Sequence, residues 1–212
     1  ILPCQPNGNH TSCQTFFRLK RHYAPGEITQ LSNNRIALPT QPKEPYQLFH
    51  WRGCYFSVFN CYELANSAER SWFRSMVDFL IAVEWNLDTN YFSNIAESSA
   101  RDLHCYFVQV NTTQYGDSRI VSPQCTEMMN ILRTKGGINE TLLIGELDIH
   151  ELRNFQNLSQ AGQKSNGKYK MTPPEFCIST LERRMRDEAI NQWGFPLNEE
   201  HAMRLGRLGL DY

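Results

Sequence analysis

Two short segments of the sequence carry side chains able to perform covalent chemistry. In the first, the apolar run Val58–Asn60 leads directly into Cys61, and Asn66 with Glu69 three residues later predicts a capped helix soon afterwards. At such a strand-to-helix turn, backbone amides and the helix dipole favour a thiolate and can stabilise a developing oxyanion. The alternative is that Cys61 is a small buried apolar residue, as most cysteines outside disulfides are.

The second segment offers an ammonium and a carboxylate. Lys20 comes just past an expected strand, and Glu27 follows a Pro25-Gly26 turn. A lysine and a glutamate separated by such a turn can face one pocket. The alternative for this segment is a solvated basic patch.

Together the two segments resemble the carbon–nitrogen hydrolase (nitrilase) superfamily. The resemblance is carried by Lys-Arg-His-Tyr-Ala-Pro-Gly-Glu at 20–27 and by Asn-Cys-Tyr-Glu at 60–63. Later elements follow in the family's order: a strand ending in Trp85-Asn86, a helix ending in Ala-Arg-Asp-Leu-His at 100–104, and Gly-Asp-Ser-Arg-Ile-Val-Ser-Pro at 116–123. The ordered series covers roughly residues 12–158.

This resemblance implies an α/β fold, an α-β-β-α sandwich, and a Glu-Lys-Cys site that needs no cofactor or metal. Cys61 would be the nucleophile that attacks a nitrile or amide carbon, and Lys20 would stabilise the oxyanion. Glu27 would match the supporting glutamate that follows the lysine, although the turn is one residue shorter here. Tyr62 and Glu63 match the aromatic and acidic residues that often follow the cysteine. The implied substrate is a small amide or nitrile.

The first glutamate of the triad has no counterpart in this sequence. It belongs upstream of the lysine, and residues 1–19 contain neither Asp nor Glu. Either it lies in a missing N-terminal part or the domain has lost its base. The start at Ile1-Leu2-Pro3 favours a fragment, so we expect an N-terminally incomplete domain.

A narrower resemblance concerns the segments 109–119, 135–137 and 152–156. They resemble the nitrilase-like domain at the C-terminus of some bacterial antiphage defence reverse transcriptases. This implies that the chain is the tail of a larger RNA-directed DNA polymerase in antiviral defence. Nucleic acid would then be handled only by the missing N-terminal polymerase region.

Composition excludes several classes of protein. Hydrophobic residues make up 41% of the 212 and the formal net charge is −1, which rules out a disordered chain and gives no global attraction to nucleic acid. The longest apolar run, Phe79–Val83, is far too short to span a membrane. Seven cysteines at irregular spacing favour reduced thiols in the cytoplasm, and the lack of a Cys-x-x-Cys pair argues against zinc.

The pattern alternates strand and helix after residue 60, which is typical of α/β proteins. We expect a nitrilase-like domain at 1–160 and a linker with an amphipathic helix at 161–212. That helix would begin at a Thr172/Glu175 capping box with Pro173 in its first turn, bury a stripe of Ile178, Leu181, Met185 and Ala189, and expose Arg183 and Arg186. The other expected strands are 13–19, 47–50, 54–60, 77–84, 105–111, 119–121 and 141–147, and the other expected helices are 66–76, 88–104, 126–133 and 148–158.

Three functions remain open at this stage. The first is a thiol-dependent hydrolase. The second is an inactive nitrilase-fold module kept for assembly or signalling, since such domains associate through sheet and helix faces; a homo-oligomer is expected. The third and weakest is a nucleic-acid-binding module, based on the basic residues Arg18, Lys20, Arg21, Arg183, Arg184 and Arg186. Charges on one side of a helix are more typical of a solvated face.

Overall fold

A computed structural model describes residues 2–4, 12–38, 46–138 and 140–188. The chain divides into two compact units, Ile1–Tyr46 and Gln47–Tyr212. Residues 161–188 belong to the second unit. Ala189, expected on the C-terminal stripe, lies outside the described residues.

The first unit contains a two-stranded antiparallel sheet and one helix. Strands β1 (Leu2–Cys4) and β2 (Ser12–Gln14) pair, and α1 spans Pro25–Asn33. The expected strand over 13–19 therefore ends early, and the expected Pro-Gly turn is the first turn of a helix. Pro25 is compatible with the first helical position, where no N–H is needed, and Glu27 accepts a hydrogen bond from the Ala24 N–H at 2.7 Å.

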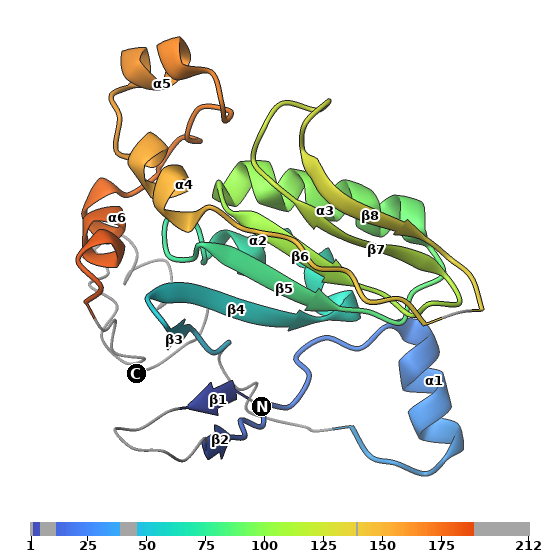
Figure 1. Cartoon of the computed structure of the whole chain (residues 1–212). Helices are drawn as coiled ribbons and strands as arrows, with labels where there is room; N and C mark the ends of the chain where they lie inside the picture. Colours follow the sequence, from blue (N-terminus) through green and yellow to red (C-terminus); the bar gives the residue numbers. More distant parts are fainter. Residues whose placement is uncertain (1, 5–11, 39–45, 139, 189–212) are drawn as a thin grey trace. The chain divides into compact units, whose positions relative to one another are not determined.

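The second unit is built on a six-stranded sheet in the order β3-β4-β5-β6-β7-β8. β4, β5 and β6 are parallel, and the outer pairs are antiparallel (Figure 1). The strands are β3 Phe49–Trp51, β4 Cys54–Asn60, β5 Phe79–Val83, β6 Tyr106–Val110, β7 Gly116–Val121 and β8 Asn130–Lys135. The helices of this unit are the 3-10 helix η1 Cys61–Ala65, α2 Ser67–Ser71, α3 Thr89–Leu103, α4 Ile149–Gln156, α5 Gln160–Asn166 and α6 Ile178–Met185. The mixed α/β class expected from the sequence is confirmed.

Helix α3 covers one face of the sheet, against β6 and β7 (Figure 1). Asp88 caps it by accepting from the Tyr91 N–H at 3.2 Å, and His104 ends it in a left-handed conformation with φ 54°. Its buried residues are Phe92, Ser93, Ile95, Ala96, Ser99, Ala100 and Leu103.

Several expected elements were wrong. The helix over 126–133 is replaced by edge strand β8, which pairs with β7. Residues 141–147 form no strand. The segment nevertheless lies close to β7 and β8, since a Cβ at Gly145 would be within 3.0 Å of side-chain atoms of Leu132 and Ile120. The linker expected from residue 161 begins with α5, because Ser159 accepts from the Gly162 N–H at 3.2 Å and Gly167 ends the helix with φ 66°.

The expected Thr172 capping box does not form. The Thr172 backbone N–H and hydroxyl instead donate to Gln163 Oε1, at 2.9 and 3.2 Å. Helix α6 starts later, with Cys177 at its N-cap. Its buried side is Leu181 with Arg184, because Ile178 and Met185 are exposed.

Arg184 is wholly buried in an ion network at the start of β5, so it is not part of a solvated face. Asp78 accepts from Arg184 Nη1 at 2.5 Å, from Arg153 Nε at 2.8 Å and from Arg153 Nη2 at 2.6 Å. The Tyr55 N–H donates to the same carboxylate at 2.8 Å. This Asp78 network connects α4 and α6 to the sheet. Because Arg184 is buried in it, the arginines of α6 give less support to the predicted nucleic-acid-binding function.

Candidate functional site

Cys61 lies where β4 ends and η1 begins, as the sequence predicted. Its φ of 47° is in the left-handed region that residues with a Cβ rarely adopt. The turn is held by Asn60, whose backbone N–H donates to Glu63 Oε2 at 2.7 Å. Such strain in a residue with a side chain is concentrated at functional sites, where the fold holds one group in a fixed position. The Cys61 side chain is half-buried.

The two residues after the cysteine differ in their surroundings. Tyr62 is half-buried, whereas Glu63 is completely buried. Glu63 stabilises the turn by accepting the hydrogen bond from the Asn60 backbone N–H.

Lys20 and Glu27 are in contact in the first unit. Lys20 Nζ lies 2.5 and 2.6 Å from the two carboxylate oxygens of Glu27, and the lysine side chain is only 14% exposed. The Lys20 ammonium also lies 5.8 Å from the ring centroid of Tyr23. Two of the three predicted catalytic side chains thus come together, while Cys61 belongs to the second unit.

In that second unit, the carboxyl ends of the parallel strands lie at one edge of the sheet. Asn60 of β4 pairs with Val83 of β5, and Val83 pairs with Val110 of β6. The residues that directly follow these three strands are therefore Cys61, Glu84 and Asn111. Ligands of open α/β sheets bind outside the carboxyl ends of strands, so this edge is where a substrate is expected.

Glu84 is a buried carboxyl at this edge that the sequence reasoning treated only as the end of a strand. It is 5% exposed, and its Oε2 accepts from Gln109 Nε2 at 2.9 Å. Its Oε1 has no hydrogen-bond partner among the described residues. Burial raises the pKa of Glu84 to about 7; the Gln109 bond and Arg119 oppose that rise, and Asp117 adds to it.

The loops after β5 and β6 are fixed to each other. The Asn86 N–H donates to Asn111 Oδ1 at 3.0 Å, and Asn111 Nδ2 donates to the Asn86 carbonyl at 2.9 Å. Beside this pair, the hydroxyl oxygen of Thr112 is a second buried polar atom with no partner in the described part of the chain.

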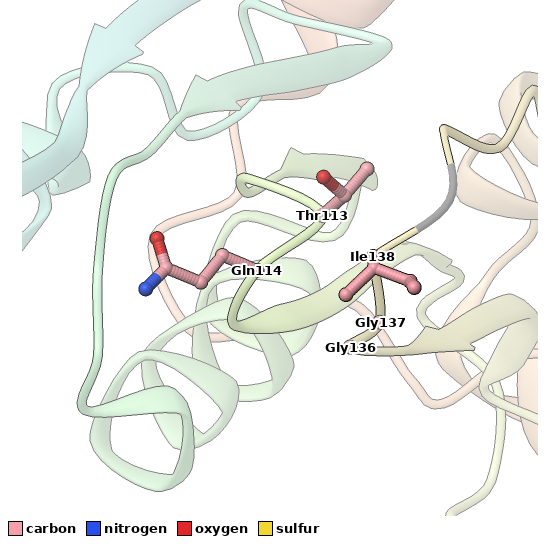
Figure 2. Close-up of a pocket in the computed structure, with 5 residues that line it drawn as sticks. All are labelled: Thr113, Gln114, Gly136, Gly137 and Ile138. Carbon is pink, nitrogen blue, oxygen red and sulfur yellow. The ribbon is translucent and has the colours of Figure 1, made fainter.

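A hollow of about 550 Å³ lies beyond the same edge, between the β6–β7 loop and the residues after β8. Figure 2 shows Thr113 and Gln114 of the first loop near Gly136, Gly137 and Ile138 of the second segment. The two segments touch closely, since a Cβ on Gly116 would lie 2.0 Å from the Gly136 nitrogen. Gly116 has φ 74°, so this contact requires glycine.

Within residues 2–4, 12–38, 46–138 and 140–188, no group of three or more His, Cys, Asp or Glu side chains is placed to hold a metal ion. None of the described helices is long and apolar enough to cross a membrane.

No family model and no curated protein sequence matches the chain. Among solved structures, it is similar to Saccharomyces cerevisiae Nit3, a member of branch 10 of the nitrilase superfamily, at 19% identity over 57% of this chain and 48% of that one, with a TM-score of 0.46. A cysteine-to-alanine mutant of the Nesterenkonia AN1 amidase, from the nitrilase superfamily, is 14% identical over 69% of this chain and 54% of that one, with a TM-score of 0.47. The CN-hydrolase superfamily protein XC1258 from Xanthomonas campestris is 15% identical over 64% of this chain and 54% of its own, with a TM-score of 0.44. The chain spans about half the length of these structures.

Sequence reasoning missed Glu84, although a signal for it exists. An acidic residue directly after a five-residue apolar run marks a carboxyl at the end of a buried strand. Its hydrogen-bond partner Gln109, which accepts in turn from Arg119, lies on another strand, so the sequence pattern alone does not reveal these surroundings.

Proposed function

We propose that the chain carries the cysteine site of a carbon–nitrogen hydrolase that acts on small amides or nitriles. The observation that carries the proposal is the left-handed backbone of Cys61 at the junction of β4 and η1. Cys61 would attack the acyl carbon to give a thioester. Lys20, paired with Glu27, would stabilise the oxyanion, and Tyr62 and Glu63 would hold the turn.

The proposal is tested by trapping the acyl-enzyme. The full chain is incubated with acetamide or butyramide, and hydroxylamine intercepts the thioester as a hydroxamate. We expect Cys61→Ala to abolish hydroxamate formation. A matched control is Cys177→Ala, which removes another half-buried thiol and should leave the yield unchanged. Equal yields from wild type and Cys61→Ala would refute the nucleophile.

A second candidate function is self-association, in line with the assembly module that the sequence left open. Apolar side chains are exposed after β5 and at the start of α3: Trp85 is 66% exposed, Leu87 75% and Tyr91 47%. Contiguous exposed apolar surface is typical of interaction sites. If self-association is the role, Trp85→Glu should shift the sedimentation coefficient towards the monomer, and Cys61→Ala should not.

The wider context is also a proposal. We propose that the chain is the C-terminal part of a bacterial antiviral defence reverse transcriptase that works in the cytoplasm. Its support is the resemblance of the segments 109–119, 135–137 and 152–156. The coding sequence upstream of Ile1 tests it, because a polymerase region must be found there.

A further inference from the structure

A second hollow lies away from the cysteine turn, between α4 and the residues around the end of α5. Its volume is about 220 Å³. Arg153 of α4 binds Asp78, which directly precedes β5, whereas Cys61 directly follows β4. Because β4 and β5 are parallel, α4 and Cys61 belong to opposite ends of these strands. The hollow is therefore separate from the site of the proposed hydrolase.

The floor of the hollow is apolar and well packed. Phe155 and Tyr169 line it, are 3% and 4% exposed, and meet edge to face with ring centroids 5.2 Å apart. The Tyr169 hydroxyl lies 3.1 Å from that of Tyr106 of β6, which fixes the ring against the sheet. Leu158 adds an aliphatic wall. Pockets for drug-sized ligands measure about 300–1,000 Å³, so this smaller hollow suits a small metabolite with an apolar part.

Two opposite charges stand at the rim of the same hollow. Lys168 Nζ donates to Glu151 Oε2, and the two side chains are 44% and 39% exposed. The other oxygen of Glu151 and the remaining N–H groups of Lys168 make no hydrogen bond to any residue that the structure describes. Glu151 can therefore accept from an ammonium and Lys168 can donate to a carboxylate while the pair stays intact.

Two primary amides, Asn154 and Asn166, complete the lining. The Asn166 side-chain oxygen accepts from the Lys168 backbone N–H at 3.2 Å, which leaves its Nδ2 group free to donate to a ligand. The Asn154 side chain makes no hydrogen bond within residues 46–138 and 140–188. The rim thus offers one positive group, one negative group and neutral donors and acceptors, above an apolar floor.

We infer that this hollow binds a free amino acid with an apolar side chain, such as leucine or phenylalanine. The ligand's ammonium contacts Glu151 and its carboxylate contacts Lys168, so that four charges alternate in sign around a ring. Both ligand groups are attached to one carbon, and they therefore reach two protein side chains that already touch each other. The apolar side chain of the ligand lies against Phe155 and Tyr169. A ligand with only one of the two charges also faces the like charge of the pair.

Isothermal titration calorimetry of the full chain tests this inference with ligands that differ by one group. L-Leucine and L-phenylalanine should bind saturably. 3-Methylbutylamine is leucine without the carboxylate, 4-methylpentanoate is leucine without the ammonium, and glycine has no apolar side chain; each should bind at least about tenfold more weakly than L-leucine. Equal affinity for all of them, or no saturable binding of either amino acid at millimolar concentration, overturns the inference. None of these ligands is an amide or a nitrile, so the outcome does not depend on the hydrolase.

Two variants then locate the site. In Glu151→Gln, L-leucine should bind about tenfold more weakly, whereas 4-methylpentanoate should bind more tightly than to wild type, because the negative charge that repels it is gone. In Lys168→Met, 3-methylbutylamine should gain affinity for the corresponding reason. Lys164→Met removes an exposed lysine of α5 that does not line the hollow, and it should leave the affinity for L-leucine unchanged. Unchanged affinity for L-leucine in both Glu151→Gln and Lys168→Met would place the amino acid elsewhere and refute this site.

Discussion

Replacing Glu84 by glutamine should change how the stability of the protein depends on pH. Folding raises the pKa of Glu84 from an ordinary 4.5 to about 7 because the carboxyl is buried. A carboxyl whose pKa is raised by folding stabilises the fold while it is protonated. Stability is therefore full below pH 4.5, falls as the pH rises, and the loss is complete above about pH 7.

The magnitude follows from the shift. Each pKa unit corresponds to about 1.4 kcal/mol, so the ionised carboxylate costs on the order of 3 kcal/mol at pH 8. Glutamine has nearly the same shape and can still accept from Gln109, but it has no charge to desolvate. The amide N–H group of the glutamine would lack one hydrogen-bond partner, which reduces the gain in stability by about 1 kcal/mol. We therefore expect Glu84→Gln to be more stable than wild type by about 2 kcal/mol at pH 8 and no more stable at pH 4.5.

Urea unfolding of both proteins at several pH values between 4.5 and 8 measures this difference. Other titrating groups are common to the two proteins, so the difference isolates Glu84. The exposed Glu146 provides a control for the substitution itself, through Glu146→Gln. A difference between wild type and Glu84→Gln that does not change with pH would refute the reasoning about burial.

Three further changes test the fold around the site. Asp78→Asn leaves two buried guanidinium groups without a countercharge and should cost about 3–5 kcal/mol in urea unfolding, whereas Arg186→Ala, at an exposed pair, should leave the free energy of unfolding nearly unchanged. Gly116→Ala should lower the melting temperature because its Cβ would strike the backbone, and Gly137→Ala, with open space around it, should not. Burial lowers the pKa of His104 to about 4, so wild type should lose stability as the pH falls from 6.5 towards 4; in His104→Gln that loss, measured by urea unfolding, should be smaller.

Elements set by local signals were predictable from the sequence. The caps Asp88 and Asp148 each accept from a backbone N–H three residues on, at 3.2 and 2.9 Å, and both helices begin where the sequence predicts. The parallel strands were predictable as apolar runs. The turn at Cys61 was predictable for the same reason, because a strand signal ends there and a capping signal follows.

Elements that depend on distant partners were not predictable. Residues 130–135 become a strand because β7 offers them a ladder, although their own pattern favours a helix. Thr172 donates to Gln163 Oε1 instead of capping a helix, and α6 has its N-cap at Cys177, five residues later than expected. The surroundings of Glu84 escape sequence reasoning in the same way, since its hydrogen-bond chain runs through Gln109 of β6 and Arg119 of β7.

The Asp78 network has a consequence for synthesis of the chain. Asp78 precedes its partner Arg153 by 75 residues and Arg184 by 106. While the ribosome is still adding those residues, the start of β5 bears a carboxylate without a countercharge, which must remain hydrated and keeps that end of the nascent sheet open. Closure waits until the last turn of α6 has left the exit tunnel, so nascent chains that stop short of Arg184 should remain sensitive to protease.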